Sequence, residues 1–298
     1  MPDPLKQSVS ATESPGLFNV SPYVTRWMLY KAFADGMDLS INEDARMSWG
    51  KKLQPLIIEQ AAEELHLEVH PNADDSYVRR GLLGCTRDAT IICPDRGPGA
   101  LETKCVFDYR TWMQDWNGGK QPPRMHEIQL QQQMFVGDGE TPYQWGVIAA
   151  WVAGEVHYFE RKPIKDLWQK LYAGAERFFR DVKEKNEPEP FGSPVELPWL
   201  AQMFPTIKGN TVDLTADPQG EFYAEVARAY KAAREQQSAG ERMCEPLRAK
   251  VLAFAKDADE VLLPGAISVR LVQSGKGKRI NVWWPDAADL PGDLRMAG

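Results

Sequence analysis

Two neighbouring segments with the character of β-strands, residues 86–92 and 100–107, constrain the fold of this chain more than any other feature. Asp88 lies in the first segment, and Glu102 and Lys104 lie in the second. Because strand side chains alternate between faces, Glu102 and Lys104 project to one side and Thr103 to the other. Pairing of the two strands would therefore bring two carboxylates and an ammonium group into one small space.

Two carboxylates at such close range repel each other unless a cation lies between them. Carboxylate oxygens are the ligands that Mg²⁺ and Mn²⁺ prefer. A lysine beside that cation could orient a water molecule, or help to deprotonate it, for attack on phosphorus. The pattern alone is not specific, because Glu and Lys two residues apart are common on the solvated face of a strand.

The composition is that of an ordinary globular protein, with 298 residues of which 43% are hydrophobic. No apolar run reaches the length that spans a membrane, and the first residues lack the basic and apolar pattern of a signal sequence. We therefore expect a protein of the cytoplasm that does not associate with a membrane. Four cysteines lack CxxC spacing, which favours reduced thiols over a metal–thiolate or iron–sulfur cluster.

The net charge of −7 argues against a uniformly basic surface, but it does not exclude DNA as a partner. Binding depends on the local potential, so a basic channel can exist on an acidic molecule. Scattered surface charges are the alternative interpretation. The candidates for lining such a channel are Lys51, Lys52, Arg79, Arg80, Arg87, Lys104, Arg110, Lys120 and Arg124.

Hydrophobic periodicity predicts an α/β fold, with an α+β mixed sheet flanked by helices. Ala153 and Gly154 indicate a tight hairpin between the last two strands of this sheet. The expected helices cover residues 46–67, 108–116, 122–136 and 163–185, and the expected strands cover residues 77–83, 86–92, 100–107, 145–153 and 155–161.

The composition divides the chain into three predicted parts. Residues 1–186 form the core, and the proline-rich residues 187–220 form a connector. Residues 221–298 form a C-terminal appendage of helix and β-hairpin. The appendage begins with one long helix or with a helical hairpin that breaks near Gly240.

Four segments between about residues 10 and 162 follow one another in a recognisable order. They are residues 19–25 (NVSPYVT), residues 49–55 (WGKKLQP), Asp88 with residues 102–104 (ETK) and Arg110, and residues 129–134 (QLQQQM). In order and spacing they resemble the YqaJ-like viral recombinase, or lambda-exonuclease, family of PD-(D/E)XK nucleases. The resemblance extends over roughly half of the chain.

The resemblance implies a restriction-endonuclease-like nuclease core and a deoxyribonuclease that uses Mg²⁺, with Mn²⁺ as an alternative. It implies a phage-type exonuclease of the bacterial host cytoplasm, which degrades linear double-stranded DNA from 5′ to 3′ for homologous recombination. Two alternatives remain open: an endonuclease of the same fold, and a weakly active or non-catalytic DNA-binding scaffold. Double-stranded DNA, a single-strand annealing protein and further copies of the chain are the implied partners.

The resemblance also implies roles for individual residues. Asp88, Glu102 and the backbone carbonyl of Thr103 would bind the metal, and Lys104 would position the attacking water. Gln129 would reach that water or Lys104. Arg110, Lys51, Lys52 and Gln131 would contact DNA or its phosphates.

Two positions depart from the family pattern. Gln54 stands where the family has a glutamate, so an oxygen is kept but a negative charge is lost. Glu59 cannot replace that charge, because five residues along a helix turn it away from the face of Gln54. His126 stands where some relatives carry tyrosine, and we expect it on the helix surface or facing DNA.

Overall fold

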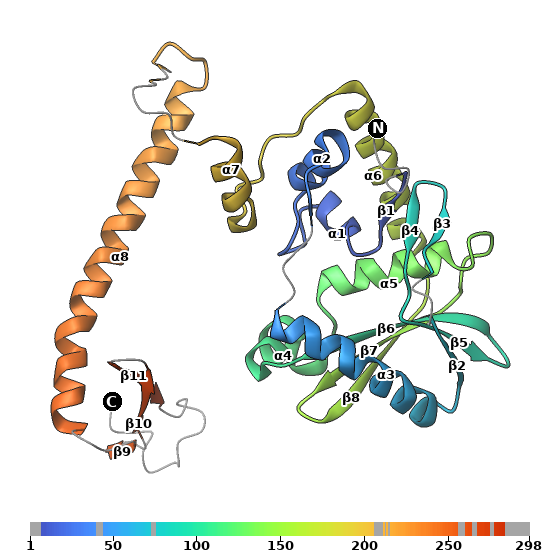
Figure 1. Cartoon of the computed structure of the whole chain (residues 1–298), viewed down its shortest axis with the longest axis horizontal. Helices are drawn as coiled ribbons and strands as arrows, with labels where there is room; N and C mark the ends of the chain where they lie inside the picture. The colour runs from blue at the N-terminus through green and yellow to red at the C-terminus, as the bar shows by residue number, and fades with distance from the viewer. Residues whose placement is uncertain are drawn as a thin grey trace. The chain divides into compact units, whose positions relative to one another are not determined.

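The computed structural model describes residues 7–39, 44–72, 76–205, 211, 213, 215–255, 260–263, 267–274 and 277–283. These residues belong to two compact units, Met1–Thr206 and Ile207–Gly298 (Figure 1). Within the described part of the chain, no helix combines the length and the apolar character that crossing a membrane requires.

A five-stranded mixed sheet with the strand order β2-β5-β6-β7-β8 lies at the centre of the first unit. β6 and β7 are parallel, and the other three pairs are antiparallel. The mixed sheet predicted from the sequence is thereby confirmed. The strands are β2 (Glu68–Pro71), β5 (Ala89–Cys93), β6 (Gly97–Val106), β7 (Gly146–Val152) and β8 (Glu155–Arg161).

The hairpin between β7 and β8 has the two-residue turn that the sequence predicts. Val152 pairs with Glu155, and the residues between them, Ala153 and Gly154, have φ angles of 50° and 99°. Positive φ at both positions matches the twist of the flanking strands. The turn therefore fixes the register of β8 on β7.

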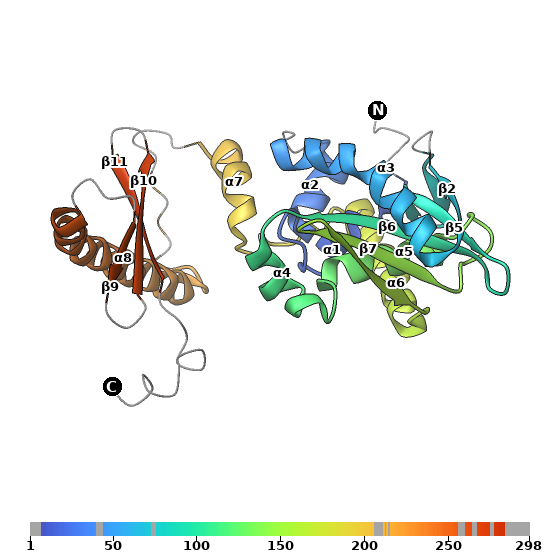
Figure 2. The same ribbon diagram turned by 90° about the horizontal axis from the view of Figure 1, so that it is seen from below.

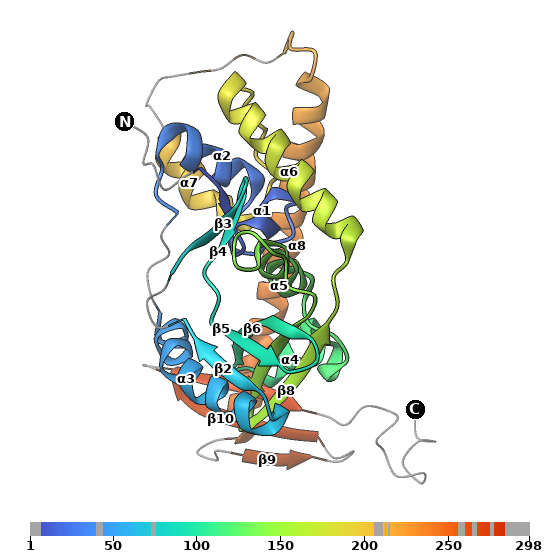
Figure 3. The same ribbon diagram turned by 90° about the vertical axis from the view of Figure 1, so that its right-hand side faces the viewer.

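Two helices cover opposite faces of the sheet, as Figures 2 and 3 show. α3 (Ala45–Leu65) packs against the strand side chains that include Leu101 and Val147. α5 (Arg124–Val136) packs against the alternate set, which includes Ala100 and Ile148. Because both faces are covered, β7 is apolar almost throughout, as expected for a strand buried on both sides.

A second layer covers α5 on the side away from the sheet. It contains α1 (Ser14–Leu17), α2 (Arg26–Asp35), α6 (Lys165–Glu184) and a small sheet of strand order β1-β4-β3. The members of this small sheet are β1 (Val9–Ser10), β3 (Val78–Arg80) and β4 (Leu83–Cys85). Buried side chains from all of these elements form one continuous apolar cluster with the outer side of α5.

The predicted strand over residues 77–83 is two strands in the structure. Gly81 has a φ of 62°, which reverses the chain between β3 and β4. The predicted strand over residues 86–92 begins only at Ala89. Residues 86–88, which include Asp88, therefore form an irregular segment between β4 and β5.

The chain after α6 folds back onto α2 through a buried carboxylate. Glu196 is fully buried and ends a short helix, η2 (Pro194–Glu196), which leads into α7 (Leu197–Met203). The Glu196 carboxylate accepts hydrogen bonds from Thr25 Oγ1 at 2.5 Å and from the backbone N–H groups of residues 191–193. These contacts attach residues 187–205 to the first unit.

Three further contacts join α2 to the same part of the chain. Trp27 Nε1 donates to Glu187 at 3.0 Å, and Lys31 forms an ion pair with that carboxylate at 2.6 Å. Arg26 pairs with Asp181 at 2.8 Å. Residues beyond 186 thus contact α2. The division of the chain at residue 186 stays a prediction.

The second unit, taken by itself, contains one long helix and a three-stranded antiparallel sheet. α8 (Gly220–Ala255) is one continuous helix through Gly240. β10 (Ile267–Ser274) and β11 (Gly277–Trp283) form the predicted hairpin, and β9 (Glu260–Leu263) adds a strand that the sequence did not indicate.

Candidate active site

The register of β5 on β6 brings Asp88 beside Glu102. The last pair of this antiparallel ladder is Ala89 with Leu101, so the residues that come next on each strand are Asp88 and Glu102. β6 continues to Val106, whereas pairing with β5 ends at Leu101. The second half of β6 therefore has an edge whose backbone groups are not bound by β5.

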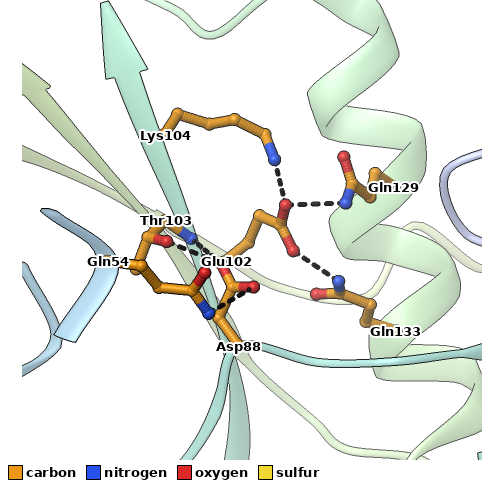
Figure 4. A network of polar contacts seen from close by, with 7 residues as sticks. All are labelled: Gln54, Asp88, Glu102, Thr103, Lys104, Gln129 and Gln133. Carbon is orange, nitrogen blue, oxygen red and sulfur yellow. Dashed lines mark hydrogen bonds and ion pairs between the residues drawn. The ribbon is translucent and has the colours of Figure 1, made fainter. Parts of the chain in front are cut away.

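Asp88 occupies this edge in place of a further strand residue. Its Oδ2 accepts hydrogen bonds from both the backbone N–H and the Oγ1 of Thr103, each at 2.6 Å. Its Oδ1 accepts a hydrogen bond from Gln54 Nε2 of α3 at 3.1 Å (Figure 4). The position at which the sequence departs from the family thus contacts a predicted metal ligand directly.

Glu102 lies on the α5 side of the sheet and is only 2% exposed. Its Oε1 accepts hydrogen bonds from Lys104 and from Gln129 Nε2, the latter at 2.6 Å. Its Oε2 accepts a hydrogen bond from Gln133 Nε2 at 2.5 Å (Figure 4). The predicted projection of Glu102 and Lys104 to one side of β6 is present in the structure.

Burial and charge shift the titration of both members of the Glu102–Lys104 pair. Burial raises the pKa of Glu102 to about 7, although the charge of Lys104 opposes that rise. Burial acts to lower the pKa of Lys104, but the charges of Glu102 and Asp88 outweigh it and leave that pKa above its usual value. Lys104 therefore carries a positive charge at neutral pH.

His126 lies next to this cluster, one turn before Gln129 on α5. Its ring stacks on Trp116 with the centroids 5.5 Å apart, and its side chain is hydrogen-bonded to Gln129. Burial, together with the charge of Lys104, lowers the pKa of His126 well below its usual value. The imidazole is consequently neutral and half-buried against Trp116, and whether it faces DNA stays a prediction.

Gln131 is not brought into the cluster, although the sequence pattern predicts a contact with DNA or phosphate. The side chain is fully buried. Its Nε2 donates to the carbonyl of Lys162 at 2.9 Å, and its Oε1 accepts from the backbone of Ile164 and from Trp168 Nε1. In this structure Gln131 holds the start of α6.

The other predicted phosphate contacts lie outside the cluster, on the surface. Arg110 is exposed in α4 (Tyr109–Asp115), and Lys51 and Lys52 are exposed on α3. The ammonium group of Lys52 lies 5.1 Å from the centre of the Trp49 ring. Whether DNA reaches these cations stays a prediction, as does the role of the Thr103 carbonyl.

Two of the candidate channel residues have structural partners at the end of α5. Arg80 donates to the carbonyl of Phe135 at 3.3 Å, and Arg87 donates to that of Gly137. Cations at this position stabilise the negative end of a helix. Arg80 and Arg87 thus help to fix the helix that carries the glutamines of the site.

Gln133 is the site residue that the sequence reasoning missed. It lies four residues after Gln129, and side chains at this spacing share one face of a helix. That spacing could have indicated Gln133, whereas Gln131 is two residues from Gln129 and points elsewhere. The family pattern drew attention to Gln131 and Met134 instead.

The donor set fits a hard divalent cation. Each carboxylate oxygen can accept about two hydrogen bonds or ligand contacts, and Asp88 Oδ1 and Glu102 Oε2 each receive one in the structure. Hard oxygen donors of this kind suit Mg²⁺ and Mn²⁺. No set of three or more Asp, Glu, His or Cys side chains with metal-binding geometry occurs among the described residues. Asp88 and Glu102 are therefore the two candidate carboxylate ligands, and that they bind a cation stays a prediction.

Comparison with known proteins gives one family match and several structural likenesses. No curated protein matches the chain. Crystal structures of the alkaline exonuclease LHK-Exo from Laribacter hongkongensis are similar, one of them in complex with dAMP. The dAMP complex is 16% identical, covers 66% of this chain and 93% of its own, and has a TM-score of 0.49.

The second LHK-Exo structure is 15% identical over 67% of this chain and 96% of its own, also with a TM-score of 0.49. A phage-related exonuclease from Haemophilus somnus 129PT is 12% identical over 60% of this chain and 96% of its own, with a TM-score of 0.44. The family match covers residues 5–141, which include Gln54, the β5–β6 pair and all of α5. Residues 5–141 match the family model of the YqaJ-like viral recombinase domain.

Proposed function

We propose that the protein is a metal-dependent deoxyribonuclease of phage type that degrades linear double-stranded DNA from an end. The observation that carries the proposal is the cluster on the unpaired edge of β6. Asp88 and Glu102 lie side by side there, and the Lys104 ammonium group contacts Glu102. The viral recombinase family of residues 5–141 supports a nuclease acting on DNA.

In this proposal Asp88 and Glu102 hold Mg²⁺, or Mn²⁺ in its place, through their remaining lone pairs. The cation supplies positive charge that stabilises the charge developing on the scissile phosphate. Gln54 and Thr103 hold Asp88 in place by the hydrogen bonds described above. Gln129 and Lys104 hold Glu102.

Lys104 has a second part in the proposed reaction. Its ammonium group donates hydrogen bonds, so it orients the attacking water and stabilises negative charge at the phosphorus. A charged lysine has no lone pair with which to take up a proton, and its role is therefore electrostatic.

Lys51, Lys52 and Arg110 are the proposed contacts to the DNA backbone, with Arg110 suited to a bidentate phosphate contact. The 5′ to 3′ polarity and the role in homologous recombination come from the family resemblance. Assembly with further copies of the chain, and with a single-strand annealing protein, is part of the same proposal.

Digestion of matched DNA substrates tests the proposal. We expect the protein with Mg²⁺ to degrade a linear duplex and to leave a covalently closed circle of the same sequence intact, because an exonuclease requires an end. EDTA should stop the reaction, and Mg²⁺ or Mn²⁺ in excess should restore it. Products from duplexes labelled at one 5′ end report the polarity.

Cleavage of the closed circle at the rate of the linear duplex would instead identify an endonuclease. DNA binding without cleavage under any divalent cation would identify a scaffold. Activity that persists in EDTA would contradict the metal-dependent chemistry proposed for Asp88 and Glu102.

A Gln54→Glu substitution should lower the Mg²⁺ concentration for half-maximal cleavage, by about tenfold, because affinity rises with the charge of the ligand set. Gln54 already contacts Asp88, so the added carboxylate lies within reach of a cation there. In EDTA the same variant should unfold at a lower temperature, since it replaces a hydrogen bond by the repulsion of two carboxylates.

Gln60→Glu is the matched control, because Gln60 lies on the same helix and is exposed. It adds the same charge away from Asp88, and its Mg²⁺ titration should coincide with that of the wild type. If the Mg²⁺ titration of Gln54→Glu also coincided with those of Gln60→Glu and the wild type, residue 54 would lie outside the metal site.

We further propose that the first unit contains all of the chemistry, because every predicted site residue lies before residue 135. The three-part division at residues 186 and 220 is part of this proposal. A shortened protein for testing it should end after residue 205, so that Glu187 and Glu196 keep their contacts with α2.

A further inference from the structure

We infer that Gln133 is a positioning residue that sets the orientation of the Glu102 carboxylate for cation binding. The inference rests on the proposed function and extends it to a residue of the segment 129–134 to which the sequence pattern assigned no role. Gln133 comes from α5, whereas Glu102 comes from β6, so the contact joins the helix to the strand (Figure 4).

The division of donors between the two oxygens of Glu102 gives Gln133 its role. Lys104 and Gln129 both donate to Oε1. Two donors on one oxygen leave the plane of the carboxylate poorly defined, because the terminal torsion of glutamate is broad. Among the described residues, Gln133 is the donor to Oε2. It therefore fixes the plane of the Glu102 carboxylate and the direction of the remaining lone pair on Oε2.

The environment of Gln133 also distinguishes it from a packing residue. The side chain is fully buried, and its Oε1 has no hydrogen-bond partner among the described residues. An unpaired buried oxygen lowers stability, and an apolar side chain of the same length would avoid that loss. Among the described residues, the Gln133 amide forms its hydrogen bond with Glu102 alone.

The neighbouring residue Gln132 has the contacts expected of a glutamine with a structural role on this helix. Gln132 is also fully buried, but its Nε2 donates to the backbone carbonyls of Val9 and Gly84, both at 2.9 Å. Its Oε1 accepts from Ser14 Oγ. Both ends of the Gln132 amide thus join α5 to the small sheet and α1, and these three hydrogen bonds involve no carboxylate.

The test compares Gln133→Met with Gln132→Met. Both substitutions remove an amide from a fully buried position of one helix and keep the length of the side chain. Calorimetric titration with Mn²⁺ in the absence of DNA measures cation affinity independently of cleavage. Thermal unfolding in EDTA and Mg²⁺ titration of cleavage complete the set.

We expect Gln133→Met to bind Mn²⁺ about tenfold more weakly, as is typical when a group that orients a metal ligand is lost. Its Mg²⁺ requirement should rise by a similar factor. Its unfolding temperature in EDTA should fall less than that of Gln132→Met, because the donor lost to Glu102 is partly offset by removal of the unpaired Oε1. Gln132→Met should show the reverse, with a lower unfolding temperature and unchanged Mn²⁺ affinity. Gln133→Asn keeps an amide, but its shorter side chain cannot reach Oε2. It should bind Mn²⁺ as weakly as Gln133→Met is expected to, and it serves as the second variant if Gln133→Met does not fold.

Wild-type Mn²⁺ affinity in Gln133→Met or Gln133→Asn would overturn the inference and leave the proposed function standing. A wild-type protein that neither binds Mn²⁺ nor cleaves DNA would overturn the proposed function, and the inference with it. Weaker Mn²⁺ binding by Gln132→Met as well would also overturn the inference, because any loss of packing in α5 would then suffice.

Discussion

Glu102→Gln should lower the rate of DNA cleavage by at least about a thousandfold, the scale on which removal of an essential electrostatic group acts. The substitution keeps the shape of the side chain but removes the charge that holds the cation. It also turns an amide nitrogen toward Gln129 or Gln133, which are themselves donors. Asp88→Asn and Lys104→Ala should have effects of the same order, the first through the cation and the second through the attacking water.

The measurement is single-turnover cleavage of a linear duplex at saturating Mg²⁺, with circular dichroism to verify the fold. DNA binding should persist in all three variants, and should strengthen for the two carboxylate variants because repulsion of phosphate is lost. Glu160→Gln is the control, since Glu160 is an exposed carboxylate of β8 that pairs with Arg96. Turnover near that of the wild type in any of the three variants would show that the active site lies elsewhere.

Glu196→Ala should destabilise the first unit by about 3 kcal/mol or more, because several donors lose a buried charged acceptor at once. Thr25 Oγ1 and the backbone N–H groups of residues 191–193 all donate to this carboxylate. For a unit of this size the loss corresponds to a fall of about 10 °C in unfolding temperature.

Urea unfolding followed by tryptophan fluorescence measures this loss, since Trp27 and Trp199 pack edge to face nearby, 6.3 Å apart. Glu196→Gln should lose less stability, because its amide oxygen still accepts one or two of the hydrogen bonds. Glu189→Ala removes an exposed carboxylate from the same segment and should leave the unfolding midpoint unchanged. Surface substitutions usually change the free energy of unfolding by about 0.5 kcal/mol or less. A change that small for Glu196→Ala would contradict the role assigned to Glu196.

Local periodicity predicts much of the first unit because its signals lie within single elements. Alternation along residues 100–107 places Glu102 and Lys104 on one side of a strand, and the structure agrees. α5 follows from the recurrence of apolar residues such as Leu130 and Met134. These features require no knowledge of which element lies opposite.

Features that depend on distant partners are harder to read from the sequence. The signal for η2 is present, because Ser193 and Glu196 have the spacing of a capping box, but the surrounding prolines favoured a connector. The burial of the Glu196 carboxylate depends on its hydrogen bond with Thr25, which lies 171 residues away. The choice of Gln133 over Gln131 depends in the same way on where β6 lies relative to α5.

The contacts that join α2 to residues 181–196 also determine when the first unit can be completed during synthesis. Thr25 is separated from Glu196 by 171 residues, Trp27 from Glu187 by 160, and Arg26 from Asp181 by 155. At the usual speed of translation, about 5–20 residues per second, Thr25 is made about 10 to 30 s before its partner. The apolar side of α2 is without its final cover throughout that interval, so a ribosome that stalls before residue 196 holds a nascent chain with an incomplete core.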